Sequence, residues 1–129
     1  MDTSREETVP TYEVIISEEA EAEQKAIFHY LFARGPDFAE VVRDGLASAI
    51  ISLPNFPGPL AWSIDNEATD LYGFEVRRVS CSGTRKSRLK TPYRILFTLI
   101  PPADPDHETV IHMLRILRGS RPLQTEEQS

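Results

Sequence analysis

The chain of 129 residues is 40% hydrophobic and has a formal net charge of −6, which suits one domain with a buried core. No run of residues approaches the ~18 consecutive apolar positions of a membrane span, and residues 1–11 lack the apolar core of a signal peptide. We therefore expect a soluble, cytoplasmic protein that has no membrane partner.

The first half of the sequence predicts a strand followed by two helices. The β-branched segment YEVIIS at 12–17 is typical of a strand. Its last residue, Ser17, precedes two glutamates, which is a typical helix start, and apolar residues at helical spacing continue to about Arg34. The Gly-Pro pair at 35–36 then ends this helix and begins a second one, which continues to about Leu53. Because the connection is so short, we expect an antiparallel helical hairpin.

The second half predicts a loop and three strands. The segment PNFPGP at 54–59 ends the second helix, and we interpret residues 60–72 as a loop. Alternating apolar residues predict strands over 74–80, 93–100 and 109–117, with a basic connection at 82–92. The expected fold class is α+β, in the order β-α-α-β-β-β, with the helical hairpin packed on a small antiparallel sheet.

The polarity of the two ends delimits the domain. We expect one domain over residues 12–123, between flexible termini at 1–11 and 124–129, because both termini are polar and show no apolar period. The single cysteine, Cys81, has no second cysteine for an internal disulfide and no clustered histidines for a metal site. We therefore expect neither a metal nor a cofactor.

Cations are concentrated in the second half of this acidic chain. Residues 1–70 contain 4 Lys or Arg and 14 Asp or Glu, whereas residues 71–129 contain 10 and 6. The stretch from Arg77 to Arg94 contains seven cations and no acid, and LRILRGSRPL at 114–123 contains three arginines and no acid. Because polyanions respond to local charge, the acidic total does not exclude an anionic partner.

The predicted strand order brings these cations to one end of the sheet. A symmetric hairpin around residues 101–108 places Arg94 near Arg115, and the preceding connection places Arg78 near Arg94. Arginine forms bidentate contacts with phosphate or carboxylate, and a cluster without local acids favours an anionic partner, either nucleic acid or an acidic protein. The alternative is that the arginines pair with the acidic helices of the same chain. The cluster consists of Arg77, Arg78, Arg94, Arg118 and Arg121, with Arg85, Lys86, Arg88 and Lys90 from the connection.

A series of motifs also carries a family resemblance. The motifs are YEVIIS followed by EEAEAE, the Gly-Pro helix junction, the LPNFPG break, the strands GFEVRRV and YRILF, and the closing MLRILRGSRPL. In this order, over about residues 12–123, they resemble the RelE/ParE superfamily of bacterial type II toxins. The closing motif differs from the superfamily at Arg118, where histidine is usual, and at Pro122, where an acid is common.

The resemblance implies a growth-arresting toxin with a cognate antitoxin as its partner, docked in the groove beside the helical hairpin. RelE-like members cleave mRNA in the ribosomal A site, whereas ParE-like members poison DNA gyrase. By this resemblance an endoribonuclease, or mRNA interferase, would use arginines as catalytic cations and the basic connection to bind RNA phosphates. The catalytic positions are Arg77, Arg78, Arg94, Arg118 and Arg121, and the phosphate-binding positions are Arg85, Lys86, Arg88 and Lys90.

Cleavage of RNA by the 2′-hydroxyl also requires a base, and arginine stays protonated at neutral pH. The candidates for a base are Lys86, Lys90 and His112, so the sequence leaves enzymatic activity open. The basic connection suits a phosphate backbone, which favours ribosome-associated mRNA binding or cleavage. Inhibition of gyrase by binding alone is the alternative, and a family member without toxicity is the third.

Overall fold

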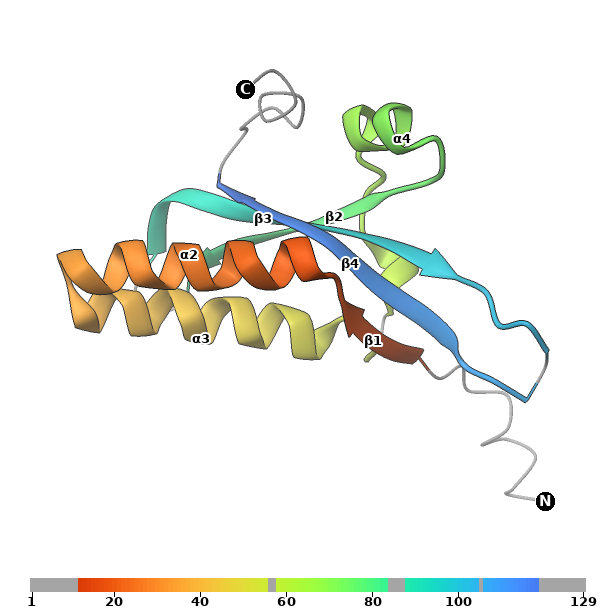
Figure 1. The fold of residues 1–129 in the computed structure, drawn as a ribbon, viewed down its shortest axis with the longest axis horizontal. Coiled ribbons are helices and arrows are strands. Elements are labelled where there is room, and N and C mark those ends of the chain that lie inside the picture. Colours follow the sequence, from red (N-terminus) through yellow and green to blue (C-terminus); the bar gives the residue numbers. More distant parts are fainter. Residues whose placement is uncertain (1–11, 56–57, 84–87, 105, 119–129) are drawn as a thin grey trace.

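The computed structural model describes residues 12–55, 58–83, 88–104 and 106–118, and it describes the backbone alone at 82–83 and 88–92 (Figure 1). The termini expected to be flexible, at 1–11 and 124–129, lie outside these ranges. None of the helices within the described ranges is long and apolar enough to cross a membrane.

The predicted α+β order is confirmed, with one helix added. The elements are β1 (Tyr12–Ile16), α2 (Glu18–Arg34), α3 (Pro36–Ser52), the 3-10 turn η1 (Pro59–Ala61), α4 (Asn66–Tyr72), β2 (Arg77–Gly83), β3 (Arg88–Ile100) and β4 (Thr109–Arg118). The prediction of a loop at 60–72 is wrong over α4. The predicted connection at 82–92 is also too long, because β3 begins at Arg88.

Helix α4 forms because both of its ends carry strong local signals. The side chain of Asp65 accepts a hydrogen bond from the backbone N–H of Ala68 at 2.9 Å, which is the N-cap contact. At the other end Gly73 adopts the left-handed conformation, with φ of 84°, and its N–H donates to the carbonyl of Thr69. An Asp cap and a closing glycine thus define a helix of 7 residues.

The four strands form a mixed sheet in the order β1-β4-β3-β2, so the prediction of an antiparallel sheet is wrong for one pair. Strand β1 pairs with β4 in parallel, whereas β2–β3 and β3–β4 are antiparallel. Strand β1 leads through Ser17 into α2, and α3 returns the chain to its starting end (Figure 1). Strand β2 runs in the same direction as β1, and β3 and β4 then each reverse direction. Strand β4 is therefore parallel to β1.

The two faces of the sheet carry two separate apolar clusters. The α2–α3 hairpin, predicted from its short connection, packs against residues such as Ile95 and Phe97. On the opposite face, α4 packs through Ala68 against Leu96 and Leu114 (Figure 1). Alternation along β3 explains this division, because neighbouring strand residues point to opposite faces. The sheet is therefore covered on both sides over part of its length.

The strand register differs from the expected one by two positions near the arginines. Ile100 pairs with Val110, one residue later than expected, and a bulge in β4 adds a second residue before Arg94 is reached. Arg94 therefore pairs with Leu117, and Arg115 lies two positions from the predicted pairing, opposite Leu96. A bulge of this kind leaves no clear mark in the amino-acid pattern.

Candidate functional site

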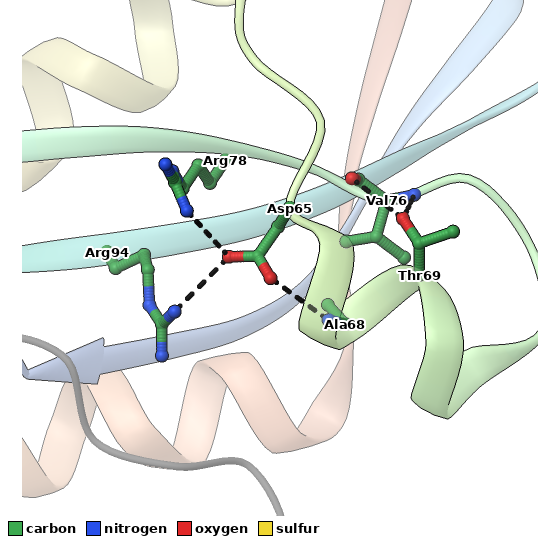
Figure 2. A network of polar contacts seen from close by, with 6 residues as sticks. All are labelled: Asp65, Ala68, Thr69, Val76, Arg78 and Arg94. Carbon is green, nitrogen blue, oxygen red and sulfur yellow. Dashed lines mark hydrogen bonds and ion pairs between the residues drawn. The ribbon is translucent and has the colours of Figure 1, made fainter.

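The predicted basic cluster is built around a buried acid, Asp65, that the sequence interpretation missed. Asp65 is 1% exposed. Its Oδ2 lies 3.4 Å from Nη1 of Arg78 and 3.2 Å from Nη1 of Arg94, while its Oδ1 caps α4. Figure 2 shows the two arginines approaching the same carboxylate oxygen from neighbouring strands. One side chain thus links β2, β3 and α4.

Backbone contacts hold Asp65 at this position. The N–H of Asp65 donates to the carbonyl of Val76 at 2.8 Å, and the N–H of Arg78 donates to the carbonyl of Ser63 at 2.9 Å. Thr69 adds a second tie, because its hydroxyl accepts from the N–H of Val76 at 2.9 Å and donates to its carbonyl at 3.3 Å (Figure 2). The segment before α4 therefore lies along the outer edge of β2.

Arg77 is engaged with a different set of partners. Its Nη1 donates to the carbonyl of Trp62 at 2.6 Å and to that of Leu60 at 3.3 Å, and its Nη2 pairs with the carboxylate of Glu75. Together with Asp65, Glu75 shows that the expectation of a cluster without local acids is wrong. The acids come from segments outside the cationic stretch of the sequence, where counting within that stretch does not detect them.

Arg115, which lies outside the predicted cluster, pairs with an acid of α2. Its guanidinium Nε donates to Oε2 of Glu23 at 2.7 Å, and Oε1 of the same carboxylate accepts the backbone N–H of Ile116 at 2.8 Å. Strand β1 has already ended there, at the Ile16–Met113 pair. Glu23 of α2 therefore takes the place of a strand partner along the edge of β4.

The structure places the predicted site residues in different surroundings. It brings Arg78 and Arg94 together on Asp65, while Arg77 is held separately by Glu75. Arg118 is exposed at the end of β4 and pairs in register with Tyr93. Arg85, Lys86 and Arg121 lie outside the described residues, and of Arg88 and Lys90 the backbone alone is described.

A groove of about 380 Å³ lies between α2 and the end of the sheet, with Tyr30, Tyr93 and Arg118 among its lining residues. This is the surface beside the helical hairpin where the resemblance places the antitoxin, and docking there stays a prediction. Burial raises the pKa of the Tyr93 phenol above its ordinary value of 10.0, and the charge of Arg118 opposes that shift. The phenol is therefore neutral at physiological pH and unsuited to remove a proton from a hydroxyl.

Two phenols, the buried Tyr93 and the half-buried Tyr72, predict a loss of stability at alkaline pH. Burial also raises the pKa of Tyr72 above 10.0, so the folded chain holds both phenol protons more tightly than the unfolded chain does. The free energy of unfolding should therefore be unaffected below pH 10.0 and should fall as the pH rises above it. Urea unfolding between pH 9 and 11 tests this, with a Tyr72→Phe/Tyr93→Phe variant as the control. An equally steep decline in the variant contradicts the assignment.

The histidines of the chain lie apart from the arginines that share Asp65. His112 pairs with Thr98, whereas Arg94 pairs with Leu117, five residues and about 17 Å further along β4. Arg118 follows Leu117 and lies about 20 Å from His112 along the strand. His107 contacts Asp104 within a turn, and His29 is exposed on α2. Among the residues that the structure describes, no group of three or more His, Cys, Asp or Glu side chains could hold a metal ion.

Comparison with known proteins gives one match. A family model described as the ParE toxin of type II toxin-antitoxin system, parDE, matches residues 14–123. No curated protein and no solved structure matches the chain. The matched range covers most of the chain and includes β2, β3, β4, the end of β1, both helices of the hairpin and Asp65.

Proposed function

Since the chain belongs to the ParE toxin family of type II toxin-antitoxin systems, we propose that it arrests growth by binding DNA gyrase in the cytoplasm, without cleaving RNA. Membership of this family implies a cognate antitoxin as the neutralising partner. The single observation that carries the proposal is that Arg78 and Arg94 share the buried carboxylate of Asp65.

The engaged arginines argue against a nuclease. Arg77, Arg78 and Arg94 each have a carboxylate partner within the chain, so an RNA phosphate would have to compete with these contacts. Of these three contacts only Arg94–Asp65 is largely buried on both sides, and breaking a buried ion pair costs about 3–5 kcal/mol. The contacts of Arg78 and Arg77 are weaker, because Arg78 is 46% exposed and Glu75, the partner of Arg77, is 53% exposed. Binding energy spent in this way does not stabilise a transition state. The three strand arginines therefore support the fold rather than a reaction.

The groove that contains Arg118 includes one carboxylate, Glu23, which is already engaged by Arg115 and by the backbone N–H of Ile116. The neighbouring phenol of Tyr93 has a raised pKa, and His112 lies on a distant part of β4. Inhibition by binding needs a complementary surface and no acid or base. The resemblance to ParE-like toxins, which poison gyrase, therefore agrees better with this arrangement than mRNA cleavage does.

Pulse labelling after tight induction in a bacterial host tests the proposal. We expect thymidine incorporation to fall within the first minutes while methionine incorporation continues, because arrest of gyrase acts on replication first. The control is the same expression vector with an early stop codon. An early loss of methionine incorporation contradicts the proposal and favours the ribosome. Unchanged incorporation of both, with folded protein present, also contradicts it and favours a member without toxicity.

A further inference from the structure

The end of the sheet far from Arg118 carries a second, apolar groove. We name it the distal groove, and its volume is about 220 Å³. Leu60 of η1 and Phe74 before β2 form its apolar walls, and they are 61% and 45% exposed. The exposed side chains of Trp62, Ile64 and Ile100 belong to the same segments. The groove is lined by Leu60, Phe74, Glu75, Arg77, Thr98 and Leu99.

An open strand edge lies within this groove. Strand β3 continues to Ile100, but its pairing with β2 ends at the Arg77–Phe97 pair. The carbonyl of Val76 and the N–H of Arg78 form hydrogen bonds on the side of β2 that faces away from β3. The backbone N–H and C=O of Arg77, the residue between them, therefore face β3. By the alternation of an antiparallel ladder, the N–H and C=O of Leu99 then face the same side as those of Phe97. Among the described residues, no strand pairs with Leu99 on that side.

The walls of the distal groove are held in place by polar contacts. Arg77 ties the carbonyls of Leu60 and Trp62 to β2, as described above, and pairs with Glu75. The hydroxyl of Thr98 donates to the carbonyl of Glu75 at 2.8 Å. A groove fixed in this way loses little conformational entropy when it binds an extended segment.

In the segments that line the distal groove or directly follow it in the sequence, acidic side chains outnumber basic ones. The carboxylate of Glu75 is 53% exposed at its rim, and the cation Arg77 is already paired with it. The turn between β3 and β4, which follows Ile100, adds the exposed carboxylates of Asp104, Asp106 and Glu108. This excess of carboxylates disfavours a nucleic acid or a second copy of the chain as the occupant. A segment with basic residues beside apolar ones is complementary.

We propose that the distal groove binds an extended, apolar segment of the protein target with basic flanking residues. The segment adds to the sheet at Leu99 and packs against Leu60 and Phe74, which is the general mode of strand addition. This inference rests on the proposed function in taking DNA gyrase as the target. It names the surface of the toxin that contacts the target and the kind of target segment that binds there.

The test compares a Leu60→Ser/Phe74→Ser variant with Phe32→Ser, a matched control in α2 whose side chain is 51% exposed. Binding of each purified protein to purified DNA gyrase is measured, and growth arrest is measured in cells. We expect the groove variant to bind at least tenfold more weakly and to lose growth arrest. The control should match the wild-type protein in both measurements.

The remaining outcomes separate this inference from the proposed function. Wild-type binding and growth arrest in the groove variant overturn the distal groove and leave gyrase as the target. If the wild-type protein does not bind gyrase but the groove variant alone loses growth arrest, another protein is the target and the groove is supported. If the wild-type protein does not bind gyrase and every variant still arrests growth in full, the groove is overturned. Dimerisation of the wild-type protein that the groove variant abolishes also overturns it, in favour of a second copy.

Discussion

Replacement of Asp65 by alanine is expected to lower the free energy of unfolding by about 3–5 kcal/mol, because it breaks the buried ion pair between Asp65 and Arg94. The carboxylate is 2% exposed and the side chain of Arg94 is 13% exposed, so water does not replace the lost contact. The substitution also removes the side-chain cap of α4, which is worth about 1 kcal/mol. Arg78 is 46% exposed, so its share of the loss is small.

Two variants separate these contributions in urea unfolding. Asp65→Asn keeps an oxygen that can accept from Ala68 but removes the charge, so it should be more stable than Asp65→Ala by about the value of the cap. Arg78→Ala, at the exposed partner, should lower the free energy of unfolding by less than about 1 kcal/mol. A change of less than about 1 kcal/mol in Asp65→Ala contradicts the central role assigned to this carboxylate.

Replacement of Glu23 by alanine is expected to lower the free energy of unfolding by roughly 3 kcal/mol. Glu23 holds the guanidinium of Arg115, which is 5% exposed, and accepts the backbone N–H of Ile116. Loss of the carboxylate leaves that N–H without its acceptor at the place where β1 no longer covers the edge of β4. The result should be a less stable end of the central strand.

Hydrogen exchange together with urea unfolding measures this effect. The amide of Ile116 should exchange faster in Glu23→Ala than in the wild-type protein, while Glu23→Gln, which keeps an acceptor oxygen, should protect it in part. Glu21→Ala is the matched control, because Glu21 is an exposed residue of the same helix. Equal protection of Ile116 in Glu23→Ala and wild type contradicts the assigned contact.

The local signals of the sequence account for most of the elements. Ser17 caps α2 as predicted, with its hydroxyl accepting from Ala20 at 3.0 Å, and the Gly-Pro pair at 35–36 separates the two helices. The same kinds of signal were present for α4, in Asp65 and Gly73. The helix was missed because it is short and its ends stand in a segment without a clear apolar period.

The partners of the arginines show where such local reasoning stops. Counting charges between Arg77 and Arg94 correctly finds no acid, yet Asp65 lies 13 residues before Arg78 and 29 before Arg94 in the chain. Similarly, Glu23 meets Arg115 across 92 residues. These distances along the sequence carry no information about distance in space, which depends on how the strands and helices pack.

The amino-acid sequence by itself therefore determined the α+β order, the helical hairpin and the resemblance to the toxin superfamily, because these depend on short-range spacing and on the succession of motifs. The tertiary structure alone decided the parallel β1–β4 pair, the bulge in β4 and the engagement of the arginines by Asp65, Glu75 and Glu23. The physical reason is that an ion pair requires two charges within a few ångströms, and only the packed sheet brings residues from distant segments that close.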